Sequence, residues 1–355
     1  MNGRMIRIGI MGATGYMGGE VVKKLLHNPL YHIAWLTSRN AGKIEDFHRN
    51  LYGCDLEFID YDKITECDAV VLSLPSGLAM ELAPVFLEKG TKVVDLSADF
   101  RLKDIVCWEK VYSKKHLRPE LVQEAVYGIP ELHRAEIKAA SLIANPGCFS
   151  SAVILGLMPL MGCEQVDKST ISVTGLSGTS GVGAELDIVA HHPEAHNNIV
   201  AYNVTGHRHT YEMEQELQLL TPDRVSIHFT PAYVPVTRGI LAVCNLFYSG
   251  DLTRDGLLRV FQDYYKDEPF IKVLNYELDI NSSWKYKPYP WVTSVAATNY
   301  CHIGVDIDTE RNRIVIFSAL DNMGKGGAHV CIENLNLMFG LEEESGLLDY
   351  GYHPC

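Results

Sequence analysis

The chain has 355 residues, of which 47% are hydrophobic and 21% charged, so we expect a folded protein of two domains rather than a disordered one. Its net charge of −13 repels phosphate backbones, and no stretch contains the roughly 18 consecutive apolar residues of a membrane span. We therefore expect neither nucleic acid nor a membrane as a partner. The N-terminus lacks the pattern of a secretory signal, and the nine cysteines include no Cys-x-x-Cys pair, which favours a cytoplasmic location and reduced thiols.

The first half of the chain alternates strand-like and helical patterns. Residues 5–11 have a strand pattern, residues 12–19 are rich in glycine, and residues 20–27 have a helical pattern. Three more strand-like runs follow, at residues 33–37, 69–74 and 92–96. Alternation of this kind predicts an α/β fold in which helices cover both faces of a parallel sheet.

A glycine-rich turn joins the first strand to the first helix. Such a turn brings backbone N–H groups close to a pyrophosphate at the helix N-terminus, although glycines also form ordinary tight turns. The residues expected to contact a dinucleotide are Gly12, Ala13, Thr14, Gly15, Tyr16, Met17 and Gly18. Ser38 and Arg39 stand where an NAD-binding chain has a carboxylate, and a guanidinium suits a 2′-phosphate instead. We therefore predict NADPH, with an exposed surface residue as the alternative reading of Arg39.

A second turn, Asn145-Pro146-Gly147-Cys148, separates a strand-like run at residues 141–144 from a helical run at residues 149–157. It places Cys148 at a helix start, where backbone N–H groups lack partners and the helix dipole favours an anion. A thiol there ionises more readily than an ordinary one, so we predict a nucleophile rather than a buried structural cysteine. Asn145 is a candidate donor to the oxyanion of the attacked carbonyl, with capping of the turn as its alternative role.

Strand-like patterns dominate the rest of the chain. They occur at residues 170–174, 224–233, 239–248 and 313–319, and residues 325–341 have the pattern of a closing helix. These runs predict an antiparallel sheet in a second domain.

Two histidines, His207 and His209, precede an acidic helical stretch. A thiolate needs a partner that shares its proton and later protonates the product oxygen. We predict His207 for this role, with His209 as the alternative. His192 and His196 are four residues apart, but Pro193 lies between them and no carboxylate-rich set follows, so we predict no metal site.

Several segments together resemble the N-acetyl-γ-glutamyl-phosphate reductase family, and the resemblance covers nearly the whole chain. The segments are residues 99–102 (DFRL), 125–132 (AVYGIPEL), 145–148 (NPGC), 177–181 (SGTSG), 206–217 (GHRHTYEMEQEL), 235–241 (PVTRGIL) and 334–340 (NLNLMFG). Seven segments in the family's order are more specific than any one of them. Residues 149–151 (FSS) depart from the usual Tyr-Pro-Thr, and residues 321–327 follow the family's pattern only in part.

The resemblance implies a Rossmann-type domain for NADP(H) in residues 1–147, to which a closing helix at about residues 325–355 returns. It implies an α+β domain with an antiparallel sheet, like that of glyceraldehyde-phosphate dehydrogenase, in residues 148–324. It also implies a homo-oligomer, a dimer or a tetramer, with Cys148 as nucleophile and His207 as acid/base. Further cofactor contacts are expected at Pro75, Ser76, Ser177, Gly178 and Asn322, and substrate contacts at Arg101, Ser180, Arg208 and His209. Arg101 resembles an arginine that contacts phosphate, with a structural ion pair to Asp99 as its alternative role.

The reaction that the resemblance implies is NADPH-dependent reduction of N-acetyl-L-glutamyl 5-phosphate to the 5-semialdehyde and phosphate, in arginine biosynthesis. A thioester on Cys148 makes this reduction feasible, because a thioester carbonyl accepts hydride more easily than an anionic acyl phosphate. One alternative is a lysine-biosynthesis reductase of carrier-linked aminoadipyl or glutamyl phosphate, although an acidic carrier suits a chain of charge −13 poorly. The other is a non-catalytic NADP-binding relative. The presence of both Cys148 and His207 disfavours it, because such a protein needs no thiolate partner.

Overall fold

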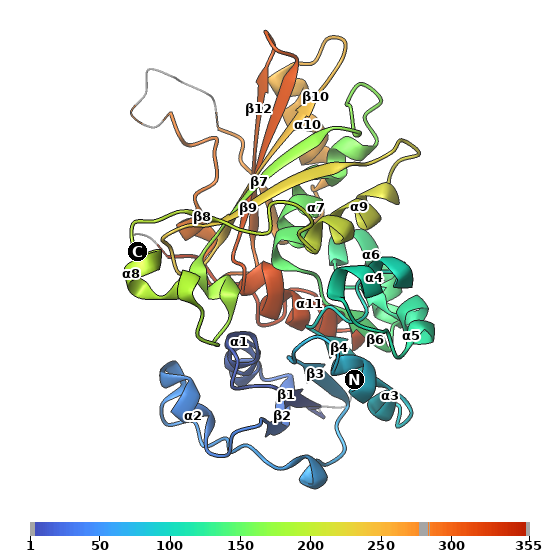
Figure 1. Ribbon diagram of the computed structural model, residues 1–355, viewed down its shortest axis with the longest axis vertical. Coiled ribbons are helices and arrows are strands. Elements are labelled where there is room, and N and C mark those ends of the chain that lie inside the picture. Colours follow the sequence, from blue (N-terminus) through green and yellow to red (C-terminus); the bar gives the residue numbers. More distant parts are fainter. Residues whose placement is uncertain (1–3, 277–282, 284, 353–355) are drawn as a thin grey trace. The chain divides into compact units, whose positions relative to one another are not determined.

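The computed structural model describes residues 4–276, 283 and 285–352 (Figure 1). The chain divides into two compact units, each described here by itself: Met1–Pro146 with Gly327–Leu348, and Gly147–Gly326 with Asp349–Cys355. The first three residues of the N-terminus and the last three of the predicted closing segment, residues 353–355, lie outside the described residues. In the described ranges, no helix is both long and apolar enough to cross a membrane.

A parallel six-stranded sheet forms the centre of the first unit, as the alternating pattern predicts. Its strands are β1 (Ile6–Met11), β2 (Tyr31–Thr37), β3 (Ala69–Leu72), β4 (Lys92–Asp95), β5 (Val126–Tyr127) and β6 (Leu142–Ala144), paired in the order β2-β1-β3-β4-β6-β5. All residues of β3 are buried, as is usual for a strand inside a parallel sheet. In this order β2 lies on one side of β1, and β3 and the later strands lie on the other. The loops after β1 and β3 therefore flank a switch point of the kind where α/β sheets bind ligands.

Helices pack against this sheet. They are α1 (Tyr16–Leu26), α2 (Ile44–Phe47), α3 (Ala79–Leu87), α4 (Ile105–Tyr112), α5 (Pro119–Glu124), α6 (Pro130–Ala139) and α11 (His329–Met338), with short 3₁₀ turns at Arg49–Leu51 and Tyr61–Lys63. The expected closing helix is thus α11, and it packs against α1, α6 and β4. Every residue of α11 is buried, including the polar residues His329, Glu333, Asn334 and Asn336.

A seven-stranded sheet forms the centre of the second unit. Its strands are β7 (Ile171–Ser177), β8 (Val200–Ala201), β9 (Ile227–Tyr233), β10 (Ile240–Phe247), β11 (Ile271–Val273), β12 (Cys301–Asp308) and β13 (Arg313–Leu320), in the order β11-β12-β13-β10-β7-β9-β8. The sheet is mixed rather than antiparallel, because β7 pairs with β9, and β11 with β12, in parallel. The long connection from β7 to β9, which includes α9 (His209–Gln218), permits the parallel pairing.

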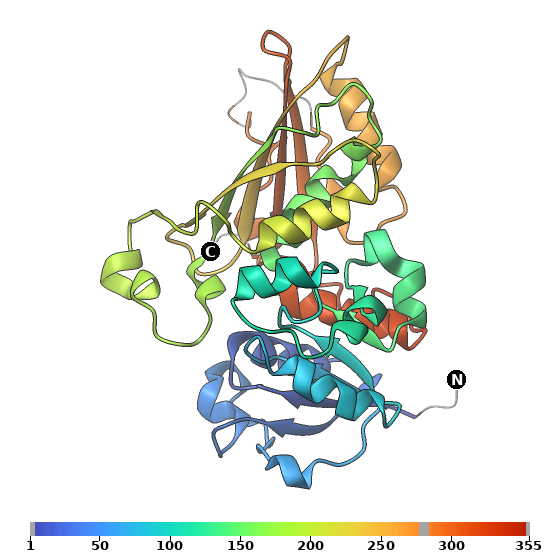
Figure 2. The same ribbon diagram turned by 45° about the vertical axis from the view of Figure 1, so that its right-hand side comes forward.

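One face of the second sheet is covered by helices. Figures 1 and 2 show α7 (Cys148–Met161), α9 and α10 (Arg254–Tyr264) on the same side of it, and α7 and α9 pack side by side. The remaining short helices are α8 (His192–Ala195), the 3₁₀ turns Thr179–Val182, Ile188–Ala190 and Val292–Val295, and a π-helical turn at Gly324–Ala328. Along β10, buried residues alternate with partly exposed ones, so the opposite face of the sheet is left open in this single chain.

Candidate active site

The glycine turn after β1 has the local geometry of a phosphate cradle. Gly12 has φ +81°, and a Cβ atom there would clash with the carbonyl oxygen of Ser73. A Cβ atom on Gly18 would lie 2.6 Å from the Gly12 oxygen, whereas one on Gly15 would meet that oxygen at 3.6 Å. Gly15 caps α1 without a side-chain hydrogen bond. The start of α1 therefore offers backbone N–H groups to an anion, and the close approaches at Gly12 and Gly18 require glycine.

Ser38 lies beside this turn, as the cofactor prediction requires. Its hydroxyl is 3.4 Å from the Thr14 hydroxyl and accepts the N–H of Asn40 at 2.9 Å. Arg39 follows it as an exposed residue. The end of β2 thus flanks the glycine turn, on the side where an NAD-binding chain holds the ribose.

The loop after β3 contains the expected cofactor residues Pro75 and Ser76. Hydrogen bonds with Asp99 and Lys114 hold this loop in place. The N–H of Gly77 donates to both carboxylate oxygens of Asp99, at 2.7 and 2.9 Å, and Gly77 has φ +108°. Lys114 Nζ donates to the Ser76 carbonyl at 2.6 Å. Burial raises the pKa of Asp99, and these N–H donors counteract the rise. Asp99, considered from the sequence only as an ion-pair partner of Arg101, thus holds this loop in place.

Arg101 and Asn145 hold the turn that precedes α7. Arg101 is buried, and its Nε donates to the Asn145 carbonyl at 2.7 Å while Nη2 donates to the Leu96 carbonyl at 3.0 Å. Asn145 is 1% exposed, and its Nδ2 donates to the Gly327 carbonyl at 3.0 Å. Both side chains therefore contribute to the shape of the turn; contact of Arg101 with substrate and of Asn145 with an oxyanion remain predictions.

Cys148 is the first residue of α7, as the turn predicts. Gly147 is the N-cap residue and has extended backbone angles of φ −72° and ψ 144°. All other residues of α7 are buried, so hydrophobic burial fixes the helix and with it the position of its first residue. A Cβ atom on Gly326 would lie 3.0 Å from the Cys148 Cβ, so the π-helical turn packs directly against the cysteine. Cys148 is partly exposed and hence accessible to a substrate.

Glu212 links this turn to His209. Glu212 is fully buried on α9, where its Oε2 accepts the N–H of Gly147 at 3.0 Å and its Oε1 lies 4.0 Å from His209 Nε2. A Cβ atom on Gly147 would lie 2.6 Å from the same Nε2, so the His209 ring rests against the residue before Cys148. A nearby carboxylate stabilises an imidazolium, which suits His209 for accepting and returning a proton.

Glu212 lies in one of the segments that resemble the family, but no role was predicted for it from the sequence. The signal that identifies it is its spacing, because residues three apart on a helix share a face, and Glu212 follows His209 by three. The structure adds the second contact, to the Gly147 N–H, that this spacing does not predict.

His207, the residue predicted as acid/base, has a different environment. Its Nδ1 accepts the N–H of His209 at 3.1 Å, and its ring centroid is 4.7 Å from that of His209 and 5.1 Å from that of Phe229. Burial, and to a lesser degree the charge of Arg208, lowers the pKa of His207 to about 4, although Glu212 opposes the shift. At pH 7 His207 is therefore neutral, with its proton on Nε2.

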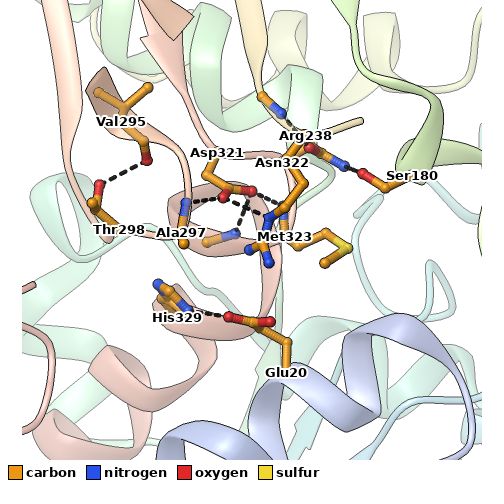
Figure 3. Close-up of polar contacts among 12 residues, drawn as sticks. Glu20, Ser180, Arg238, Val295, Ala297, Thr298, Asp321, Asn322, Met323 and His329 are labelled. Atoms are coloured by element: carbon orange, nitrogen blue, oxygen red, sulfur yellow. Dashed lines mark hydrogen bonds and ion pairs between the residues drawn. The ribbon is translucent and has the colours of Figure 1, made fainter. Parts of the chain in front are cut away.

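The expected contacts at the end of β7 lie together in the second unit (Figure 3). Asn322 Nδ2 donates to the Ser180 hydroxyl at 3.0 Å, and Asn322 Oδ1 accepts the N–H of Gly239 at 2.7 Å. Gly178 donates its N–H to the Gly239 carbonyl at 2.9 Å, and Ser177 precedes it as the last residue of β7. Folding thus gathers these four predicted residues; what each of them binds remains a prediction.

Asp321, next to Asn322, organises the segment that departs from the family's pattern. Figure 3 shows its buried carboxylate accepting hydrogen bonds from Arg238 Nε at 2.9 Å and from the backbone N–H groups of Ala297, Met323 and Gly324. Ala297 has φ +61°, a strained value for a residue other than glycine, so the bond to Asp321 holds an unfavourable loop conformation.

Two other contacts involve histidines: His329 with Glu20, and His192 with His196. In the first unit, His329 Nε2 lies 3.0 Å from Glu20 Oε1, a buried contact between α11 and α1 that Figure 3 also shows. In the second, the rings of His192 and His196 are 5.0 Å apart. Within the ranges that the structure describes, no group of three His, Cys, Asp or Glu side chains could hold a metal ion.

Family comparisons agree with both units. Residues 7–140 match the model described as semialdehyde dehydrogenase, NAD binding domain, and residues 148–322 match the semialdehyde dehydrogenase dimerisation domain. The N-acetyl-gamma-glutamyl-phosphate reductase of Desulforamulus reducens is 39% identical, and the alignment covers 99% of this chain and 100% of that protein. The protein of the same name from Methanosphaera stadtmanae is 40% identical, over 98% of this chain and 99% of its own length.

Solved structures of lower identity share the fold. Aspartate semialdehyde dehydrogenase II of Vibrio cholerae superposes with a TM-score of 0.69 at 18% identity, over 95% of this chain and 99% of that one. The aspartate semialdehyde dehydrogenase of Candida albicans, solved with NADP, has a TM-score of 0.62 at 15% identity, over 95% and 99%. The expected fold class, a Rossmann-type domain followed by an α+β domain, is confirmed. The full-length matches show that the chain belongs to the N-acetyl-gamma-glutamyl-phosphate reductase family of semialdehyde dehydrogenases.

Proposed function

We propose that this protein reduces N-acetyl-L-glutamyl 5-phosphate to N-acetyl-L-glutamate 5-semialdehyde and inorganic phosphate, with NADPH as the reductant. The observation that carries the proposal is the start of α7, where an accessible Cys148 follows a turn bonded to Glu212, with His209 against the same turn. A nucleophile, a base and a residue that orients the base are the parts that covalent acyl transfer needs.

The first unit fits the cofactor. Gly12 and Gly18 leave no room for a side chain, so the backbone N–H groups at the start of α1 can approach a pyrophosphate closely. We assign Ser38 and Arg39 to the 2′-phosphate and the loop at Pro75 and Ser76 to the rest of the cofactor. Bound there, NADPH supplies the hydride that reduces an acyl group.

Cys148 divides the reaction into two steps. Its thiolate forms a C–S bond to the γ-carbonyl carbon, and the bond from that carbon to the phosphate oxygen breaks, so that phosphate leaves with the bonding electrons. The resulting thioester accepts a hydride, and the thiohemiacetal then releases the aldehyde and the thiolate. Backbone N–H groups at the start of α7 stabilise the oxyanion, while Asn145 and Arg101 keep the turn in shape.

We assign the proton transfer to His209 rather than to His207, the residue favoured from the sequence. His209 adjoins Gly147 and has the buried Glu212 carboxylate beside it. His207 uses Nδ1 as an acceptor and has a pKa of about 4, so it serves as a neutral Nε2–H donor to the substrate. The exposed Arg208, between the two, suits the substrate carboxylate, because guanidinium and carboxylate form paired hydrogen bonds.

The proposed function is tested most directly in reverse. Purified protein is mixed with N-acetylglutamate semialdehyde, phosphate and NADP⁺, and formation of NADPH is followed. We expect a rate that requires all three components and that vanishes when phosphate is omitted. A protein that turns over only a carrier-linked aminoadipyl or glutamyl semialdehyde has the lysine-pathway activity instead, and one that binds NADP⁺ without turnover is a non-catalytic relative.

The cofactor assignment predicts the outcome of Arg39→Ala. Removing the guanidinium removes a charged hydrogen bond to the 2′-phosphate, so we expect the ratio of kcat/KM for NADPH to that for NADH to fall by about 10–100-fold. Arg49→Ala is the matched control, because Arg49 is also exposed and lies on the 3₁₀ turn Arg49–Leu51 of the same unit. An unchanged ratio in Arg39→Ala makes Arg39 an ordinary surface residue.

We further propose that a second copy of the chain covers the open face of the second sheet. The residues on this face are partly exposed and include Leu241, Val243, Val315 and Phe317. An aspartate there has to be buried at the interface without a partner. We therefore expect Val243→Asp to convert the oligomer to monomers, as measured by light scattering after size-exclusion chromatography. Leu219→Asp, at an exposed position beyond α9, is the control; if Val243→Asp keeps the wild-type mass, the face is not the interface.

A further inference from the structure

His48, the residue that caps the C-terminal end of α2, contacts the glycine turn of the first unit. Its Nε2 lies 2.8 Å from the carbonyl oxygen of Ala13, the residue after Gly12. A carbonyl oxygen can only accept a hydrogen bond, so this nitrogen carries the proton and donates it. His48 therefore binds a backbone group inside the turn that we assign to the cofactor.

The backbone of His48 is held on both sides. Its N–H donates to the Ile44 carbonyl at 3.0 Å, and its own carbonyl accepts the N–H of Leu51 at 2.9 Å. Ile44 and Leu51 are both buried, so they anchor the segment around His48 in the core of the first unit. The imidazole thus extends toward Ala13 from a fixed position.

Gly19, on α1, makes room for this imidazole. A Cβ atom on Gly19 would clash with Cε1 and Nε2 of His48 and would lie 2.6 Å from Nδ1. Gly19 does not have a positive φ, so its helical backbone alone does not require glycine. A side chain at this position would push the ring away from Ala13. Glycine at position 19 is therefore what permits the hydrogen bond.

The hydrogen bond to Ala13 sets the direction of the next N–H group. In a planar trans peptide the carbonyl and the N–H point in opposite directions. Because the Ala13 carbonyl points to His48, the Thr14 N–H points away from it. No described residue accepts this N–H, and α1 begins two residues later. The Thr14 N–H therefore joins the donors that the start of α1 offers to an anion.

The glycine turn binds a pyrophosphate through backbone N–H groups, so its affinity depends on where these groups point. We propose that His48 is a positioning residue for NADP(H): by holding the Ala13 carbonyl, it directs the Thr14 N–H at the pyrophosphate. This inference rests on the proposed placement of the cofactor at the glycine turn.

The test measures binding rather than turnover. Isothermal titration calorimetry gives the Kd of NADPH and that of adenosine 2′-phosphate, which lacks the pyrophosphate. We expect His48→Ala to raise the Kd of NADPH by about 10-fold, the effect of one lost hydrogen bond to a charged group. The Kd of adenosine 2′-phosphate should stay unchanged, whereas general damage to the first unit would weaken both ligands.

Two further variants separate the hydrogen bond from the bulk of the side chain. His48→Gln should restore most of the affinity for NADPH, because the glutamine amide can donate to the Ala13 carbonyl. His32→Ala is the matched control, since His32 is an exposed histidine on β2 of the same unit. It should bind both ligands like the wild type.

A double-mutant cycle tests the contact from the other side. Gly19→Ala should raise the Kd of NADPH about as much as His48→Ala, because the added methyl group displaces the imidazole. In the His48→Ala background the methyl group has room, so Gly19→Ala should then have no further effect. Alanine favours a helix more than glycine does, so a loss of affinity in Gly19→Ala does not reflect a weaker α1.

Three results overturn the proposal: equal losses for both ligands in His48→Ala, an unchanged Kd of NADPH in that variant, or independent effects of the two substitutions in the cycle. The failure of the proposed function looks different, because wild-type protein then has no turnover of N-acetylglutamate semialdehyde, whatever the His48 variants bind.

Discussion

Replacing Cys148 with serine should lower kcat by about 10⁴-fold or more, the size of effect seen when an enzyme loses its nucleophile. A serine hydroxyl at the start of α7 stays protonated near neutral pH and attacks an acyl phosphate poorly, whereas a thiol forms the anion that attacks. Its volume is similar and its neighbour Gly326 needs no adjustment, so the fold should persist. Steady-state rates test the loss of kcat, and a melting temperature tests whether the fold persists.

The covalent step has a direct readout. Wild-type protein mixed with the acyl phosphate, without NADPH, should gain the mass of the N-acetylglutamyl group, and Cys148→Ser should not. Cys163→Ser is the matched control, because Cys163 is a partly exposed thiol just beyond the other end of α7. An adduct of the same mass on Cys148→Ser would place the nucleophile elsewhere.

The second large effect is expected at His209. His209→Asn removes the imidazole that lies against the turn before Cys148, 4.0 Å from the Glu212 carboxylate, and general acid–base catalysis contributes about 10²–10⁴-fold. His207→Asn should lower kcat less, by about 10-fold, because it removes only the hydrogen bond that the neutral His207 donates to the substrate. Comparison of kcat for the two variants ranks the two histidines.

The pH dependence gives an independent check of this ranking. Burial lowers the pKa of His207 to about 4, so we expect the acidic limb of the wild-type kcat/KM profile to lie well above pH 4 if His207 is not the proton-transfer group. A larger loss of kcat in His207→Asn than in His209→Asn, or an acidic limb near pH 4, returns the role to His207.

The sequence predicted the parallel sheet of the first unit and most strands of the second, because runs of buried apolar residues have a local pattern. It did not reveal the direction in which strands pair. Parallel pairing of β7 with β9 depends on the path of the long connection between them, not on either strand's own residues. It also passed over β12, whose inward residues alternate with the polar or small residues His302, Gly304 and Asp306.

The sequence by itself determined the parts of the site that depend on backbone sterics. Gly12 has a positive φ and Gly18 touches backbone, so only glycine fits at either position. Pro146 and Gly147 separate a strand from α7, and this local pattern predicts that Cys148 begins the helix. Steric constraints of this kind involve only neighbouring residues in the chain, so a short stretch of sequence is enough to predict them.

Only the tertiary structure distinguished the two candidate histidines from each other. His207 and His209 look alike in sequence, but burial lowers the pKa of His207, while folding brings Glu212 and the turn at Gly147 to His209. The pKa of a side chain and its hydrogen-bond partners depend on desolvation and on charges from distant segments, so they exist only once the chain is folded.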